Sequence, residues 1–183
     1  EFPHVLLNIL FQYGKSRTED FLGGKTDVMF GRKNAFSHIP HIEAHTIFQS
    51  HIYLMVQKDD PLANKSAVSP QDLAGRTLMI GGGSPPELKK AQEIVIDSVH
   101  VQTMNSEDHF TSLVNVAAGN GVCLSPGFCN DRTDEFKWIP ITFGTPIDCA
   151  LATRSDDRRE TTRRFIEITK EIYEAHNDEK EML

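Results

Sequence analysis

The stretch SEDHFTSLVNVAAGNGVCLSP, residues 106–126, contains the signals that decide the fold. Ser106 is a typical N-terminal cap of a helix, and four apolar residues follow it at helical spacing: Phe110, Leu113, Val114 and Ala117. Gly119 is a typical helix stop, and Val122–Leu124 is a short apolar run of the kind found in buried strands. The stretch therefore predicts a helix followed by a strand that ends near Ser125.

The same alternation of helix and strand continues on both sides of this stretch. Strands are expected over residues 42–48, 51–57, 76–80, 99–104, 137–141 and 147–153, and longer helices over 85–97 and 157–175. A short helix capped by Ser69 is expected after residue 69. The last helix is expected to bury Phe165, Ile168 and Ile172. This order predicts an α/β protein with one or two mainly parallel sheets.

The first thirty residues predict a strand, a helix and a second strand. Val5–Tyr13 is an apolar run of strand length, Ser16–Leu22 a helix closed by two glycines, and Thr26–Phe30 the next strand. Such a unit joins two parallel strands by a right-handed crossover.

The charge balance excludes direct binding of nucleic acid by this chain. Its 183 residues include 19 Lys and Arg against 26 Asp and Glu, which gives a formal net charge of −7. A surface that neutralises phosphates needs an excess of basic residues. If the protein acts on DNA, another segment makes that contact.

The cysteines and the apolar runs indicate a cytoplasmic protein. Cys123, Cys129 and Cys149 form no CxxC pair, and an odd count does not suit a secreted disulfide framework. We expect them to be buried apolar side chains. No window approaches the ~18 apolar residues of a membrane span, and the first residues do not resemble a signal peptide.

The sequence shows no catalytic or metal-binding motif. His38, His41, His45 and His51 are close in sequence, but no zinc-ligand spacing and no neighbouring cysteine completes a set. A GxSxG turn, an HExxH helix and a persuasive pair of acids are also missing. We therefore expect neither an enzyme, nor a bound metal, nor a cofactor.

A glycine-rich turn at residues 81–84 is the first candidate ligand site. Gly82, Gly83 and Ser84 lie between an expected strand and an expected helix, where backbone N–H groups can hold an anion. The two prolines at 85–86 remove two of these donors, and Ser84 with Glu87 matches a capping box. The turn is either a ligand-facing loop or purely structural, and it lacks the ending of a nucleotide-binding P-loop.

The other candidates also follow expected strands, where ligands of open α/β sheets bind. Asn105 or Ser106 either caps the following helix or faces a ligand, together with Gly121 and Pro126. Arg32 follows the strand ending at Phe30 and offers a planar guanidinium for a carboxylate, although a surface ion pair is the competing interpretation. Lys15 and Ser16 follow the Val5–Tyr13 strand.

Four segments, in this order, resemble the sensing domains of LysR-type transcriptional regulators. The first is residues 14–30, which ends in GGKTDVMF. The others are HIYLMVQKDDPLAN at 51–64, SPQDLAG at 69–75 and the stretch at 106–126. Each segment alone is a weak signal. Their order and spacing extend the resemblance over essentially the whole chain.

The resemblance implies two Rossmann-like lobes joined by two crossover strands, as in type II periplasmic binding proteins. Residues 1–56 with 151–183 would form one lobe and residues 57–150 the other, with hinge strands at 51–58 and 147–153. The family also has an N-terminal winged helix-turn-helix, and the sensing domain usually begins with a strand and helix that have no match here.

By the same resemblance, a small effector, expected to be anionic, binds between the lobes and controls transcription. The implied partners are further copies of the chain, as a dimer or tetramer, and promoter DNA contacted only through the winged helix-turn-helix. Two other interpretations stay open: a solute-binding protein of a transporter, which would carry an export signal, and a small α/β enzyme.

Overall fold

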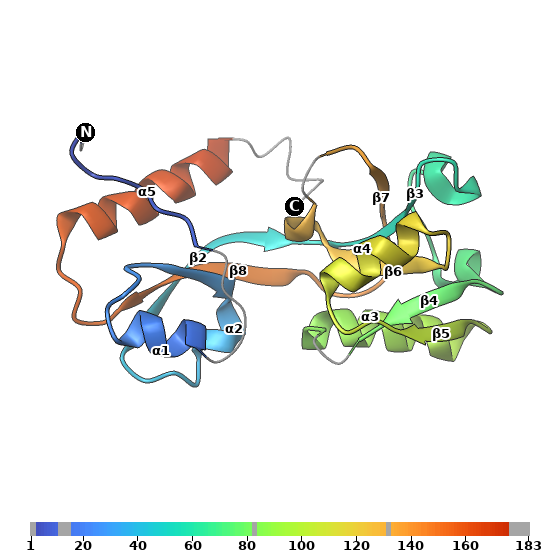
Figure 1. The fold of residues 1–183 in the computed structure, drawn as a ribbon, viewed down its shortest axis with the longest axis horizontal. Helices are drawn as coiled ribbons and strands as arrows, with labels where there is room; N and C mark the ends of the chain where they lie inside the picture. The colour runs from blue at the N-terminus through green and yellow to red at the C-terminus, as the bar shows by residue number, and fades with distance from the viewer. Residues whose placement is uncertain (1–2, 11–15, 82–83, 131–132, 176–183) are drawn as a thin grey trace. The chain divides into compact units, whose positions relative to one another are not determined.

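The computed structural model describes residues 3–10, 16–81, 84–130 and 133–175, and it divides into two compact units. Unit one contains the chain up to Phe48 and the part from Asp148 into the last helix, and unit two spans Gln49–Ile147. Both boundaries fall inside strands, β2 (Ile42–Ser50) and β8 (Ile147–Arg154), so these two strands connect the units (Figure 1). The first boundary thus precedes the hinge strand expected at residues 51–58.

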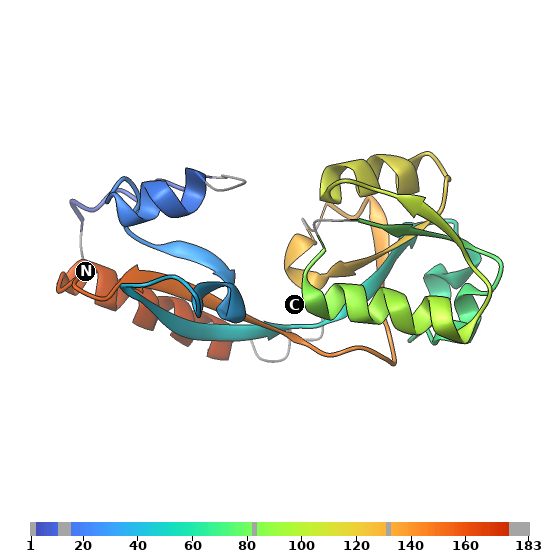
Figure 2. The same cartoon turned by 90° about the horizontal axis from the view of Figure 1, so that it is seen from below.

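Unit one is a three-stranded sheet with a helix on each face. The strand order is β1-β8-β2, and β1 (Met29–Arg32) pairs antiparallel with β8. Figure 2 shows α1 (Ser16–Leu22) and α5 (Glu160–Ala175) on opposite sides of this sheet, and the four-residue α2 (Lys33–Phe36) follows β1 directly. A small core of five buried residues holds α1 and α2 to the sheet: Phe21, Met29, Phe36, Ala150 and Ala152.

The prediction of a strand over Val5–Tyr13 is wrong for residues 5–10, which form no strand. Residues 11–13 lie outside the described residues. Five apolar side chains of this segment are exposed: Val5, Leu6, Leu7, Ile9 and Leu10. A strand needs hydrogen bonds to a neighbour. The described sheet of unit one offers this segment none, so the expected parallel crossover is wrong as well, because β1 pairs antiparallel with β8 instead.

Unit two is a five-stranded mixed sheet with the order β5-β4-β6-β3-β7. Its strands are β3 (Ile52–Gln57), β4 (Thr77–Ile80), β5 (Gln102–Asn105), β6 (Val122–Pro126) and β7 (Phe136–Pro140). The expected parallel pairing holds for β4 with β5 and β6, whereas β3 runs antiparallel to both β6 and β7.

Two helices cover the faces of this sheet. Figure 2 shows α3 (Pro86–Ser98) on one side and α4 (His109–Ala117) on the other. Three short 3-10 helices, η1 (Pro61–Asn64), η2 (Pro70–Leu73) and η3 (Gly127–Cys129), lie in the connections. The expected Ser69 cap is confirmed, because Ser69 and Asp72 form a capping box.

Helix α4 begins later and faces differently than the sequence predicts. Asp108, not Asn105 or Ser106, caps it by accepting a hydrogen bond from the backbone N–H of Thr111 at 2.7 Å. Phe110 and Val114 are 72% and 65% exposed and Ala117 is also exposed, so three of the four apolar residues at helical spacing do not face the core. The helix instead buries the polar Ser112 beside Val116. Ser112 and Val116 are four residues apart, so they lie on one face of the helix, and this face meets the sheet.

The starts of α3 and α5 also differ from the prediction. Pro85 occupies the N-cap of α3 and makes no side-chain cap bond, so the capping box of Ser84 with Glu87 is wrong. Helix α5 begins at Glu160 and buries Thr162 and Ile166, whereas Ile172 is 53% exposed. In the part of the chain that the structure describes, no helix combines the length and apolar character needed to cross a membrane.

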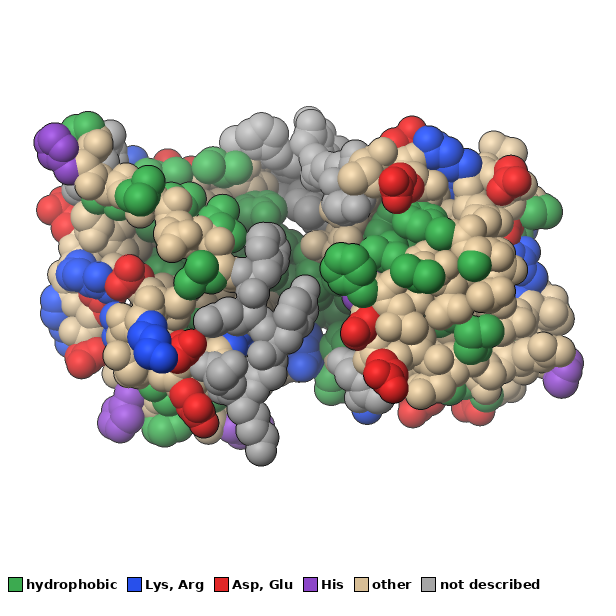
Figure 3. Space-filling model, in the orientation of Figure 1, with side chains coloured by type: hydrophobic (Ala, Val, Ile, Leu, Met, Phe, Trp, Pro, Cys, Tyr) green, Lys and Arg blue, Asp and Glu red, His purple; other side chains and the backbone are tan. Residues whose placement is uncertain are grey.

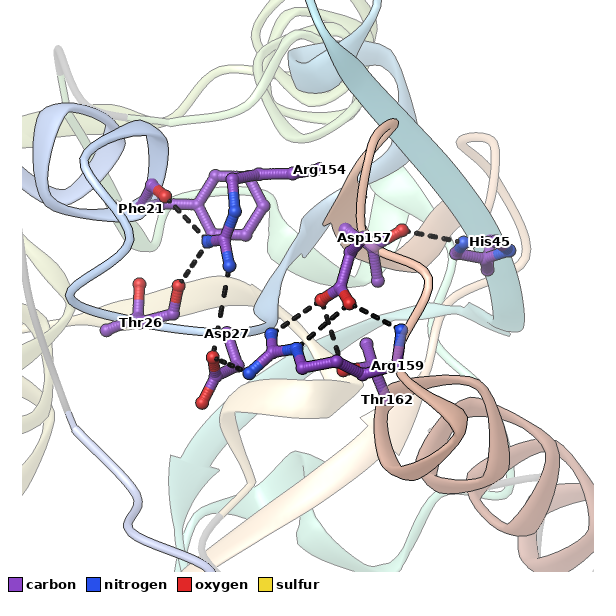
Figure 4. Close-up of polar contacts among 9 residues, drawn as sticks. Phe21, Thr26, Asp27, His45, Arg154, Asp157, Arg159 and Thr162 are labelled. Carbon is purple, nitrogen blue, oxygen red and sulfur yellow. Dashed lines mark hydrogen bonds and ion pairs between the residues drawn. The ribbon is translucent and has the colours of Figure 1, made fainter.

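An ion-pair network fixes the start of α5 to the loop between α1 and β1 (Figure 4). Arg154 donates to the backbone oxygens of Phe21 and Thr26 at 3.0 and 2.8 Å. Arg159 bridges Asp27 at 2.7 Å and Asp157 at 2.6 Å. The Asp157 carboxylate, 3% exposed, also accepts from the backbone N–H of Arg159 and from the hydroxyl of Thr162. Asp157 therefore satisfies several donors at once.

We expect Asp157→Asn to lower the free energy of unfolding by about 1–3 kcal/mol, because it removes the charge of the buried carboxylate to which Arg159 and Thr162 donate. The Arg159 guanidinium holds the pKa of Asp157 well below its usual value. This contribution is therefore present above pH ~4, the ordinary carboxyl pKa, and is lost as the pH falls below it. Urea unfolding at pH 7 and pH 3 measures both effects.

The matched control is Asp156→Asn, since Asp156 is the exposed neighbour. Equal losses for the two variants, or a loss for Asp157→Asn that does not shrink at pH 3, would contradict this role of the network.

Candidate functional site

The carboxyl edge of the sheet in unit two brings several predicted residues together. Strands β4 and β5 are parallel and end in register at Ile80 and Asn105, and β6 runs parallel to β4 and ends at Pro126. Asn105, Ser106 and Pro126 therefore lie along the same edge, the usual ligand edge of an open α/β sheet. Asn105 is exposed, and its side chain makes no hydrogen bond to any described residue.

A close backbone contact sets the geometry of this edge. The backbone N–H of Ser106 donates to the oxygen of Ile80 at 2.7 Å. A Cβ placed on Gly81 would lie only 2.1 Å from the Ser106 backbone oxygen, so no other residue fits there without a shift. Gly81 thus serves chain packing. Gly82 and Gly83 lie outside the described residues, and Ser84 follows as a half-buried residue ahead of α3.

The hydroxyl of Ser106 belongs to the start of α4. It is buried, with the residue 4% exposed, and lies 2.8 Å from the hydroxyl of Ser112 and 3.2 Å from the backbone oxygen of Asp108. The backbone N–H of Thr111 lowers the pKa of Asp108, so this cap carries a negative charge near neutral pH. At this edge, the Asn105 side chain is therefore more available to a ligand than Ser106.

Gly121 does not join this group. A Cβ at Gly121 would lie 2.4 Å from the backbone oxygen of Thr77, the first residue of β4. Gly121 is therefore at the opposite edge of the sheet from Ile80 and Asn105, where it permits the close approach of two chain segments.

A cavity of about 470 Å³ lies at the same carboxyl edge and was missed by the sequence reasoning. Strand β3 begins at Ile52 opposite Pro126, and β7 ends at Pro140 opposite Tyr53. The cavity is lined by residues 51–53, Ser66 and residues 140–146. Its size is within the ~300–1,000 Å³ of small-molecule sites.

The lining of this cavity combines apolar and polar groups. The polar side chains are those of His51, Ser66, Thr142 and Thr145. The loop that closes it turns at Gly144, which has φ +86°. The Gly-Thr-Pro sequence between two strands was the available signal, because glycine and proline mark such turns.

In unit one the structure places Arg32 and the start of α1 at the same end. Helix α1 runs back along β1, so that its first residue, Ser16, lies at the end where β1 finishes (Figure 2). The half-buried Arg32 contacts Asn34 at 3.4 Å. Lys15 and the side chain of Ser16 lie outside the described residues.

The thiols of unit two are not suited to nucleophilic chemistry. Burial raises the pKa of both Cys123 and Cys129 to about 11. A reactive thiol needs a lowered pKa. Among the described residues, histidines, cysteines and acids form no group of three that could hold a metal ion.

Two α/β units connected by two strands make up a fold of the type II periplasmic-binding class. Residues 1–173 match the family model of the LysR substrate binding domain, and the chain belongs to this family. It is thus a ligand-sensing regulatory domain, which confirms the resemblance. No curated protein matches the chain.

Solved structures agree on the fold. The regulatory domain of MetR, a LysR family regulator from N. meningitidis, is 20% identical with a TM-score of 0.59, covering 95% of this chain and 82% of that one. The BenM effector binding domain with benzoate is 20% identical, with a TM-score of 0.64 and coverage of 88% and 76%. That of QuiR with shikimate is 15% identical, with a TM-score of 0.65 and coverage of 88% and 78%.

We expect Gly81→Ala to destabilise the protein by about 1–3 kcal/mol, because the new methyl group would overlap the backbone of Ser106. Chemical denaturation checks the value. Gly75→Ala is the matched control: its φ is +74°, but nothing lies within 4 Å of an added Cβ, so only backbone strain is introduced. An unchanged unfolding midpoint for Gly81→Ala would show that the close contact is absent.

Proposed function

We propose that this domain senses a small organic anion, and that each of its two units has candidate contacts for it. In unit two these are Ser84, Asn105 and Pro126 at the carboxyl edge of the sheet, with Ser106 holding that edge in place through its hydrogen bond to Ile80. The nearby cavity, lined by both apolar side chains and polar ones, suits a small ligand that combines an apolar part with polar groups. We leave Gly121 out of the site, because the opposite edge of the sheet holds it.

In unit one we propose Arg32, with Lys15 and Ser16, as the contact for the negative charge. A guanidinium can pair with a carboxylate through two parallel hydrogen bonds. Benzoate and shikimate, bound to the BenM and QuiR domains, are both carboxylates, which supports an anionic effector here. Arg32 carries this part of the proposal because it is the last residue of β1, at the end of unit one where α1 begins.

The bound anion would act by shifting an equilibrium between arrangements of the two units, which we propose are the two lobes of the sensing domain. A ligand shifts such an equilibrium only by its different affinities for the two states. The readout would be promoter DNA bound by a separate winged helix-turn-helix segment, and the ligand would leave chemically unchanged. The three free cysteines support a cytoplasmic setting.

We also propose that the domain works as a homo-oligomer, a dimer or tetramer. Phe110 and Val114 are exposed on one side of α4, and Figure 3 shows apolar side chains gathered over this helix. Exposed apolar side chains that lie next to one another mark association surfaces more often than single exposed ones do.

Arg32→Gln should weaken binding of a carboxylate effector about 10- to 100-fold, because a hydrogen bond to a charged group contributes about 1.5–3 kcal/mol. Calorimetric titration with carboxylates that raise the melting temperature provides the measurement. Lys33→Gln is the control, since Lys33 is the exposed neighbouring cation. The proposal fails if Arg32→Gln binds like the wild type, or if both variants lose the same affinity.

Phe110→Ser with Val114→Ser should weaken self-association at least tenfold without lowering stability, because both side chains are exposed in the isolated chain. Light scattering across a dilution series gives the dissociation constant. Ile96→Ser, which changes an exposed apolar residue on α3, is the control. An unchanged dissociation constant for the double variant would remove α4 from the interface.

A further inference from the structure

A second cavity lies wholly within unit one, between α5 and strand β2. It measures about 380 Å³ and is lined by Glu43 and His45 of β2, Thr153 of β8 and residues of the 157–170 segment. Strand β2 is one edge of the sheet and β1 is the other, with β8 between them. This groove is therefore separate from Arg32, which ends β1.

Most charges in the groove are already neutralised by neighbours. Asp157 is held by Arg159, as described above. Glu167 lies 3.3 Å from Arg163 and 3.4 Å from Arg164. Each of these acids is neutralised by an arginine, so the ion pairs contribute little net charge to the groove.

Two cations that line the groove are not neutralised by a neighbouring acid. Arg158 and Lys170 make no ion pair with any residue in the described ranges. Among the acids that line the groove, Glu43 alone makes none with a described residue. Arg158 is exposed and Lys170 half-buried. The uncommitted side chains therefore leave the groove with a net positive charge.

A histidine hydrogen bond completes the lining. The Nε2 atom of His45 lies 3.0 Å from the Thr153 hydroxyl, and Figure 4 shows the imidazole facing the chain segment that leads into α5. Thr153 is 5% exposed. This contact holds the ring, while its second nitrogen can serve as a hydrogen-bond partner for a ligand.

We propose that this groove is a second anion site, which takes a small oxyanion of the phosphate type. Arg158 and Lys170 supply the charge, and His45 supplies a hydrogen bond. The start of α5 is not the binding element, because Asp157 already accepts from the backbone N–H of Arg159 and from Thr162. Arginine and lysine are the side chains that proteins use for phosphate oxygens.

The site would let the domain respond to a second, chemically different anion, independently of the effector contact at Arg32. The groove and the effector contact at Arg32 lie on opposite edges of one sheet in unit one. The proposal of a phosphate site would therefore hold even if the effector proposal were wrong.

Inorganic phosphate is the probe, titrated into the isotope-labelled full chain at constant ionic strength with chloride as the reference anion. We expect saturable amide shifts at residues 43–46, 152–154 and 157–170. The double variant Arg158→Gln, Lys170→Gln should weaken phosphate binding at least tenfold, and His45→Gln should weaken it by a smaller factor.

The control is Lys89→Gln with Lys90→Gln, two exposed cations of α3 in unit two, which should bind phosphate like the wild type. Shifts that do not saturate, that map elsewhere, or that the control variant reduces equally would overturn the proposal. Loss of phosphate binding in Arg32→Gln would also overturn it, because the anion would then occupy the effector site. If the double variant does not fold, the exposed Arg158→Gln change and the wild-type shift map decide the question.

Discussion

The contact between Gly81 and Ser106 is the constraint on which the ligand edge of unit two depends. Only a glycine lets the residue after β4 approach the residue after β5 so closely. The backbone N–H of Ser106 then donates a hydrogen bond to the backbone oxygen of Ile80. This alignment leaves Asn105 exposed at the edge and places the hydroxyl of Ser106 against α4. The packing of one glycine thus determines which neighbouring side chain can meet a ligand.

Most of the fold could be predicted from the sequence because its signals are local. The Ser69 cap, the stop at Gly119 with φ +74°, and the strand at residues 51–57 all depend on neighbouring residues. Features that depend on distant partners could not be predicted. Val5–Leu10 has the composition of a strand but no pairing partner among the described residues. Asp108 caps α4, while the hydroxyl of Ser106 lies against that of Ser112.

The candidate site was only partly visible for the same reason. Asn105, Ser106 and Pro126 follow strands, and parallel strands bring such residues to one edge. Gly121 resembles them in sequence, yet it lies at the start of β6 beside Thr77. The cavity near His51 forms where the beginning of β3 meets the end of β7, a pairing that no local pattern indicates.

The central claim is that an organic anion binds along the carboxyl edge of the unit two sheet. A crystal structure with a carboxylate that stabilises the protein tests it most directly. The account predicts ligand density within hydrogen-bonding distance of Asn105, with a contact to the end of β6 at Pro126. Density at the opposite edge, beside Gly121 and Thr77, would contradict it.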